Sequence, residues 1–181
     1  MSSTNFRDVA RVTLVVALFV VVQQTLVLDL RIGGVHPDIM VLLPIVAGIA
    51  GGPGRGASMG FGAGLVADLF LPTPFGLSAL VGCLLGFAVG VTTLALDRTA
   101  RWLPPLAALV ASAVYEMTYA ALGAVLGQPQ MLHVDLLRIV LLVSVVNALL
   151  ALPALRLMVW ATPEASTEGV PTSTASLGGL R

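Results

Sequence analysis

Long apolar runs, separated by short polar or turn-forming segments, dominate this chain. A helix that crosses a lipid bilayer needs about 20 mostly apolar residues, within a range of roughly 17–25. Six runs fit or approach that length, at about residues 9–30, 38–52, 54–71, 76–96, 102–127 and 138–160. The pattern predicts an all-α integral membrane protein, with a six-helix transmembrane bundle over residues 1–161.

The second and third runs are short and rich in glycine. We interpret them as two full spans, and one re-entrant unit is the alternative. Pro44 lies inside the second run and is expected to kink its helix. The turn between the two runs is expected around Gly51 to Gly56.

The two ends of the chain differ in character. The first run resembles a secretory signal peptide, but Gln23, Gln24 and Asp29 stand where a cleavage site needs small residues, so we expect a retained helix. From about Thr162 the chain is rich in Ser, Thr, Gly and Pro and has no aromatic residue, which predicts a disordered cytoplasmic tail over 162–181.

Composition supports the membrane assignment. The 181 residues are 57% hydrophobic and 10% charged, with a formal net charge of +0. A soluble domain carries roughly 25% charged residues. The nine basic residues are all arginine and form no basic patch, which argues against a nucleic-acid partner. Cys83 is the only cysteine, so no intrachain disulfide can form.

Arginine positions predict the orientation, because basic residues concentrate in cytoplasmic loops. With a cytoplasmic N-terminus and six spans, two arginines, Arg31 and Arg138, fall outside. Six fall inside, namely Arg7, Arg11, Arg55, Arg98, Arg101 and Arg156. Both termini are therefore expected in the cytoplasm.

Glycines recur at every fourth position in two places, which would place each set on one face of a helix. The sets are Gly48, Gly52, Gly56, Gly60 and Gly64, and then Gly82, Gly86 and Gly90. Small residues let helices approach closely in lipid, where no hydrophobic drive brings them together. We expect the third and fourth spans to cross closely, and docking of a partner protein on one stripe remains the alternative.

Asp68 lies near the outer end of the third span, just before the turn P-T-P-F-G at 72–76. Its carboxylate is expected to accept hydrogen bonds from backbone N–H groups around Phe75 to Leu77, where the fourth helix starts. Contact with a partner chain is the alternative. Asp68→Asn should be tolerated if the residue only caps that helix.

Two further polar residues lie deep in apolar runs. Glu116 is near the centre of the fifth span, and Asn147 lies at similar depth in the sixth. A charge at that depth is costly, so Glu116 is expected to be neutral or paired, with Asn147 as its natural partner. A hydrogen-bonded structural cluster is the favoured interpretation, and a proton or substrate site is the alternative.

Two motifs suggest chemistry that their context does not support. Residues 56–60 match the hydrolase pattern G-x-S-x-G, but no catalytic base is expected on the same side of the membrane. His36-x-Asp38 and His133-x-Asp135 could hold a metal, but Asp at a helix start explains the carboxylates without one. We predict no enzyme activity, catalytic residue, cofactor or metal.

Three segments together resemble the rod shape-determining protein MreD family. They are Pro37-Asp38 leading an apolar helix, G-x-x-A-D-L-F-x-x-x-P-F-G at 64–76, and G-F-A-V-G at 86–90. Charged residues that often follow the last motif in the family are sparse here. The matching positions are Pro37, Asp38, Gly64, Asp68, Pro74, Phe75, Gly76, Gly86 and Gly90.

The resemblance implies a non-enzymatic scaffold of the cell-elongation machinery in the bacterial inner membrane. Such proteins bind MreC, and other elongation-complex membrane proteins are further candidate partners. Through MreC they link MreB filaments to peptidoglycan synthesis and rod shape. A homodimer remains open.

The competing function is transport. MreD proteins look similar in span count to the substrate-binding components of energy-coupling-factor vitamin transporters. Such a component would dock its energising partner through small residues, typically alanines four apart, on the first helix, and that pair is missing here. A vitamin site would also need polar and aromatic side chains in the outer loops.

Overall fold

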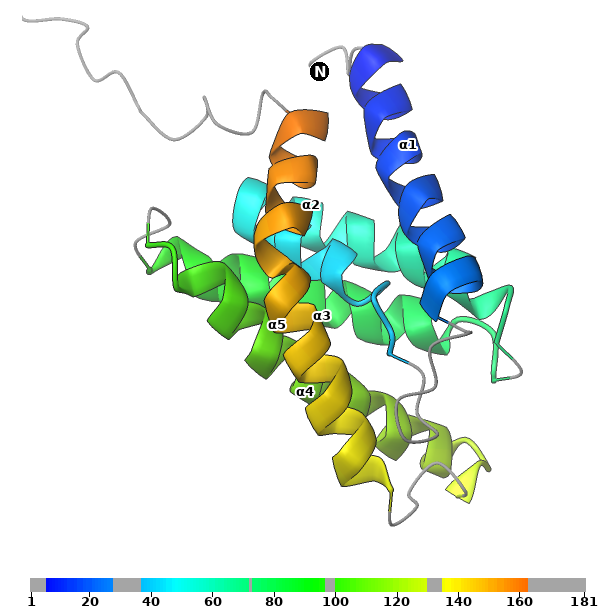
Figure 1. Cartoon of the computed structure of the whole chain (residues 1–181). Coiled ribbons are helices and arrows are strands. Elements are labelled where there is room, and N and C mark those ends of the chain that lie inside the picture. Colours follow the sequence, from blue (N-terminus) through cyan, green and yellow to red (C-terminus); the bar gives the residue numbers. More distant parts are fainter. Residues whose placement is uncertain (1–5, 28–36, 72, 97–99, 130–134, 163–181) are drawn as a thin grey trace, which may run out of the picture.

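The computed structural model describes residues 6–27, 37–71, 73–96, 100–129 and 135–162, all of them helical or connecting segments. Five α-helices follow one another in the described residues, with a π-helical turn, η1, after the first (Figure 1). Their bounds are α1 Phe6–Val22, η1 Gln23–Val27, α2 Leu42–Asp68, α3 Leu77–Leu94, α4 Leu103–Val125 and α5 Leu136–Ala161. The expectation of an all-α protein is confirmed.

Three of these helices are long and apolar enough to cross a membrane. They are α3 with 18 residues, α4 with 23 and α5 with 26. The apolar part of α1 and η1, Val9–Thr25, is shorter. Within the described residues, three long apolar helices are thus compatible with a membrane protein, and six separate long helices are not seen.

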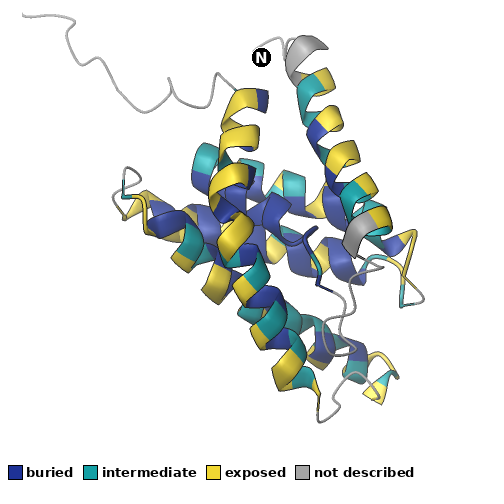
Figure 2. Ribbon diagram, in the orientation of Figure 1, coloured by how far each residue is buried: buried dark blue, intermediate teal, exposed yellow. Residues whose placement is uncertain are grey.

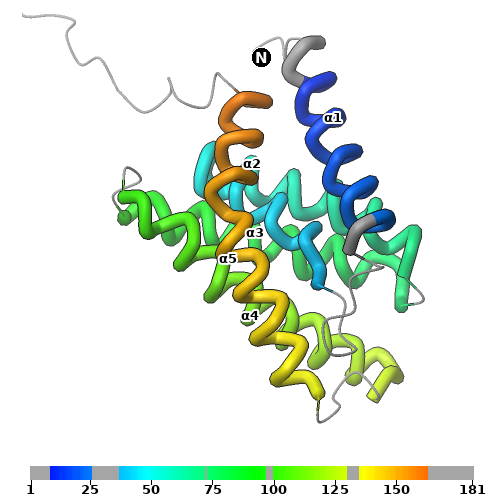
Figure 3. The backbone as a smooth tube through the Cα atoms, in the orientation of Figure 1, coloured from blue at the N-terminus to red at the C-terminus, as the bar shows by residue number. Residues whose placement is uncertain are grey.

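Helix α2 contains a break at Gly52, whose φ of 78° and ψ of −173° are not helical. A Cβ at Gly56 would lie 2.9 Å from the Cα of Gly48. Residues eight apart in a straight helix are about 12 Å apart, so the chain must reverse between them. Two arms, residues 42–51 and 53–68, therefore form a helical hairpin, and Figure 3 shows its path in the backbone tube.

The position of the break corrects the expectation for Pro44. Helix α2 begins at Leu42, so Pro44 lies in the first turn, where a missing N–H leaves no hydrogen bond unmade. The first arm would be only about 15 Å long, roughly half the thickness of the hydrocarbon core. The two full spans expected at 38–52 and 54–71 are not seen as separate helices, and α2 is not among the described helices that are long and apolar enough to cross a membrane.

The glycine stripes pack against each other inside the protein. A Cβ at Gly60 would strike the carbonyl oxygen of Gly82, and one at Gly56 would strike that of Gly86. Gly64 meets the backbone of Ala79, and Gly90 meets that of Pro53. This backbone-to-backbone contact confirms the close crossing that the glycine spacing predicts.

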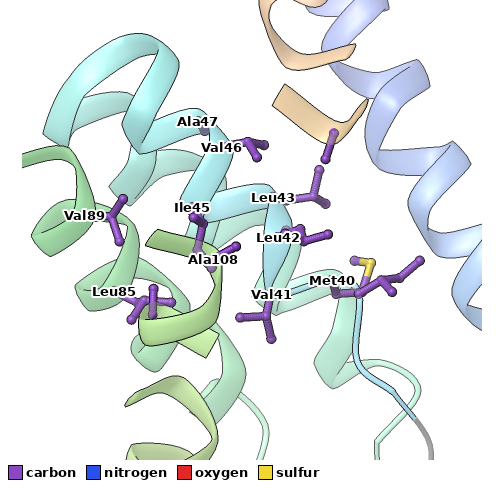
Figure 4. Packing of buried hydrophobic residues seen from close by; sticks show 14 of the residues in the cluster. Met40, Val41, Leu42, Leu43, Ile45, Val46, Ala47, Leu85, Val89 and Ala108 are labelled. Carbon is purple, nitrogen blue, oxygen red and sulfur yellow. The ribbon is translucent and has the colours of Figure 1, made fainter. Parts of the chain in front are cut away.

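The first arm of α2 is the centre of the fold. All of its residues from Leu42 to Ile49 are buried, and Leu42, Leu43 and Ile45 are 0% exposed. Figure 4 shows these side chains packed with Leu85, Val89 and Ala108 from α3 and α4. By contrast, α1 and α5 keep exposed outward faces, as Figure 2 shows.

The start of α1 and the end of α5 lie at the same end of the molecule. The guanidinium of Arg11 lies 5.4 Å from the centroid of the Trp160 ring. This contact places the two ends of the helical domain together. The tail beyond Thr162 lies outside the described residues.

Candidate functional site

Asp68 joins α2 to α3 through its carboxylate. Its Oδ2 accepts the backbone N–H of Gly76 at 2.8 Å and that of Ala79 at 3.4 Å, and its Oδ1 accepts that of Ser78 at 3.1 Å. These N–H groups belong to the first turn of α3 and have no partner within the helix. The predicted contact is confirmed, although it extends to Ala79 rather than ending at Leu77.

The turn before α3 depends on the same contact. Gly76 has a φ of 95°, a conformation that residues with a side chain rarely adopt. The backbone carbonyl of Pro74 accepts the N–H of Leu77 at 3.2 Å, and Tyr119 of α4 donates a hydrogen bond to Thr73 at 2.8 Å. Phe75, by contrast, is exposed. Three of the predicted residues, Asp68, Pro74 and Gly76, thus hold the end of α2 against the start of α3, and α4 contacts the same turn. We call this arrangement the lock around Asp68.

Asn147 is fully buried, but its partner is not the predicted one. Its Nδ2 donates to the backbone carbonyl of Asp38 and to Oγ of Ser112, both at 2.9 Å, while its Oδ1 has no hydrogen-bond partner. The expected pair of Glu116 and Asn147 is therefore wrong. The start of α2 lies next to Asn147, so the backbone carbonyl of Asp38, just before that helix, accepts the hydrogen bond of the Asn147 amide instead.

Gln23 holds the segment that leads into α2. Its Nε2 donates to the carbonyl of Pro37 at 3.1 Å, and its Oε1 accepts the N–H of Ile39 at 3.0 Å. The residue belongs to η1, and π-helical turns are frequent at functional sites. The sequence analysis noted Gln23 because it does not suit a cleavage site, and it did not predict these hydrogen bonds. A polar residue at the end of an apolar run was the signal that could have predicted them.

Asp38 lies between Pro37 and Ile39, the two residues that Gln23 holds. Its Oδ1 accepts the N–H of Met40 at 2.9 Å, two residues before α2 begins. Asp38 and Glu116 are both partly buried.

A half-open cavity of about 130 Å³ borders Asp38. We call it the polar cavity, because two glutamine amides and a carboxylate line it together with apolar side chains. The described residues around it are Val20, Gln23, Gln24, Asp38, Met40, Ala67, Phe70 and Leu71. It therefore lies where η1, the segment before α2 and the end of α2 meet.

A larger hollow of about 440 Å³ lies between α3 and α4. We call it the apolar groove. Its lining residues are Leu85, Ala88, Val89, Thr92, Thr93, Leu96, Trp102, Leu103, Leu106, Ala107, Val110, Ala111 and Val114. The hydroxyls of Thr92 and Thr93 bond to carbonyls of their own helix, at 2.8 Å to Ala88 and 2.9 Å to Val89. The groove therefore offers contact area and almost no free polar group.

The residues of the two chemical motifs do not form a reactive site among the described residues. The hydroxyl of Ser58 donates to the carbonyl of Arg55 at 3.1 Å and lies exposed on α2. His36 and His133 lie outside the described residues. Within the ranges described, no three His, Cys, Asp or Glu side chains gather around a point where a metal could bind.

The geometry thus provides an internal lock, a small polar cavity and an apolar groove. Comparison with protein-family models, with curated proteins and with solved structures found no match to this chain.

Proposed function

We propose that this chain is a non-enzymatic scaffold of the MreD kind in the bacterial inner membrane. It binds MreC and, through it, links MreB filaments to peptidoglycan synthesis and rod shape. Helices α1, α3, α4 and α5 cross the membrane, and α2 enters from the outer face. Both termini stay in the cytoplasm whether α2 counts as two spans or as one re-entrant hairpin.

The apolar groove is the observation that carries this proposal. Helices associate in lipid through van der Waals fit, small residues and a few hydrogen bonds. The groove supplies the small side chains of Ala88, Ala107 and Ala111 between larger apolar ones, on helices that are apolar enough to cross a membrane. A single transmembrane helix of a bitopic partner fits such a surface.

The lock around Asp68 supports the proposal in a second way. Of the positions that resemble the family, Gly64, Asp68, Gly76, Gly86 and Gly90 all belong to the contact between α2 and α3. This contact joins α2 closely to α3, and α4 packs against both helices. The motif residues therefore do not line the groove. They hold α3, one of its two helices, against α2.

Co-purification in a mild detergent tests the proposal. The chain and MreC of the same organism are co-expressed, and the chain is captured by a tag. Ala88→Leu fills the groove from an exposed position, and Ala121→Leu adds the same side chain at an exposed position of α4 outside the groove. We expect MreC to be recovered with the wild type and Ala121→Leu and to be lost with Ala88→Leu. Wild-type protein that never captures MreC contradicts the proposal.

The alternative is a substrate-binding subunit of an energy-coupling-factor vitamin transporter. The polar cavity is the observation that favours it, because amide and carboxylate groups converge there. Its 130 Å³ are well below the roughly 300–1,000 Å³ of pockets that hold drug-sized ligands. Thermal stabilisation of the purified chain by a vitamin would support transport over the scaffold.

A further inference from the structure

The turn between α2 and α3 exposes bulky apolar side chains. Its described residues are 69–71 and 73–76, and we call them the α2–α3 turn. Leu69 is 70% exposed and Phe75 is 67% exposed, and Phe70 and Leu71 are exposed as well. Apolar surface is unfavourable in water, so exposed apolar side chains that gather in one place mark a contact with protein or with lipid.

The same part of the sequence offers little that would hold the turn in water. Between Asp68 and Asp97 there is no Asp, Glu, Lys or Arg. Asp68 is itself buried, and its carboxylate accepts N–H groups from the start of α3. The hydroxyl of Thr73 accepts a hydrogen bond from Tyr119. The charge and the hydroxyl nearest to the turn are thus both engaged within the protein.

The backbone of the turn is also largely satisfied without water. This matters because backbone polar groups that contact lipid have to find their partners inside the protein. Pro72 and Pro74 carry no N–H group. Six other donors between residues 69 and 79 have an acceptor within the chain, namely the N–H groups of Leu69, Phe70, Gly76, Leu77, Ser78 and Ala79. Asp68 accepts three of these six, so the lock around Asp68 removes much of the need for solvent.

Helix length places the turn at the depth of the acyl chains. Helix α3 has 18 residues. At this length it is about 27 Å long, whereas the hydrocarbon core is roughly 30 Å thick, and any tilt shortens the depth that it spans. Asp97 follows α3 closely in the sequence, and a charge at that end has to reach water. The other end of α3, where the turn lies, is therefore the end that stays within the core.

We propose that the α2–α3 turn is immersed in the membrane, with the side chains of Leu69 and Phe75 against lipid acyl chains. In the proposed orientation this is the outer leaflet. The inference goes beyond the proposed function, since it needs a bilayer around α3 and no protein partner. It also gives a role to Phe75, which the resemblance to the family singled out and which the lock around Asp68 leaves exposed.

Spin labels on single cysteines test the inference in the full chain, reconstituted in vesicles of phosphatidylcholine. Cys83→Ala provides the background, and Phe75→Cys and Leu69→Cys carry the test labels. Leu84→Cys is the reference for lipid, because Leu84 is exposed near the middle of α3. Asp135→Cys is the reference for water, because Asp135 is an exposed charged residue just before α5. Thermal unfolding shows whether each variant is folded.

Collisions of a label with dissolved oxygen report acyl chains, and collisions with a water-soluble nickel complex report water. We expect the labels at Phe75 and Leu69 to match the label at Leu84, with frequent oxygen collisions and few nickel collisions. The label at Asp135 should show the reverse. Two test positions flank the turn, so the failure of one variant to fold leaves the other to decide.

Two results would overturn the inference. Test labels that meet the nickel complex as often as the label at Asp135 does would place the turn in water. Test labels that neither reagent reaches would show that protein covers the turn, as in an association of two copies. The proposed function is tested separately, because a chain that gives the expected collisions and captures no MreC loses the scaffold role and keeps the immersed turn.

Discussion

The carboxylate of Asp68 accepts the backbone N–H of Gly76 at 2.8 Å, which ties the last residue of α2 to the residue before α3. Both oxygens of this carboxylate are engaged, one by Gly76 and Ala79 and the other by Ser78. The charge therefore lies at the positive end of α3, and three N–H groups at the start of that helix are satisfied together.

This arrangement changes the expectation for Asp68→Asn. An amide offers one acceptor oxygen and places an NH₂ group against a backbone donor. We predict that Asp68→Asn lowers the stability of the folded protein by about 2–3 kcal/mol, because one buried donor loses its partner and the charge is removed. Thermal unfolding in detergent measures the loss. Stability equal to that of the wild type would contradict the lock and would return Asp68 to a partner-binding role.

The glycine contact gives a second prediction. A Cβ at Gly60 would collide with the carbonyl of Gly82, whereas a Cβ at Gly62, on the same helix, would meet nothing within 4 Å. Gly60→Ala should destabilise the protein by about 1–3 kcal/mol, as overpacking in a well-packed interior does. Gly62→Ala should be neutral or slightly stabilising, since alanine favours the helix. Equal unfolding temperatures for the two variants would show that the stripe does not pack internally.

The hairpin of α2 gives a third prediction. Gly52 has a φ of 78° and open space where a Cβ would lie, and Gly54 has similar space without a positive φ. Gly52→Ala should therefore lower stability by about 1–3 kcal/mol through backbone strain alone. Gly54→Ala is the control and should have little effect. If the two variants unfold alike, the chain does not reverse at Gly52.

Asn147 gives a fourth prediction. Asn147→Ala would leave the carbonyl of Asp38 and the hydroxyl of Ser112 without this donor. We expect a loss of about 1–3 kcal/mol, the range for a buried group left unsatisfied. Ser144→Ala is the control on the same helix, because the buried Ser144 hydroxyl has no hydrogen-bond partner to lose. A milder effect at Asn147 than at Ser144 would be inconsistent with the observed hydrogen bonds.

The sequence allowed prediction of those features that depend on spacing within the chain. The contact of Asp68 is local, since its acceptors and the N–H groups of α3 are about ten residues apart. The glycine spacing fixes one helix face for Gly56, Gly60 and Gly64 and another for Gly82, Gly86 and Gly90, and these two faces pack together. The single face expected from Gly48 to Gly64 is wrong, because the chain reverses at Gly52. Local chemistry was enough in both cases.

Other features depend on how distant segments meet, and the sequence could not supply them. A proline kinks a helix in its interior but not in its first turn, so the effect of Pro44 depends on where α2 begins. Asn147 has several polar groups within reach, and only the path of the chain before α2 selects the Asp38 carbonyl. The apolar groove is formed by residues of both α3 and α4, and no apolar pattern within one segment encodes how two helices meet.

Native mass spectrometry of the chain extracted from its own membranes in a mild detergent tests the central claim most directly. The account predicts a complex whose additional mass is a second membrane protein with one transmembrane helix. A chain that carries no protein partner and instead holds a vitamin-sized molecule between its helices would contradict the account.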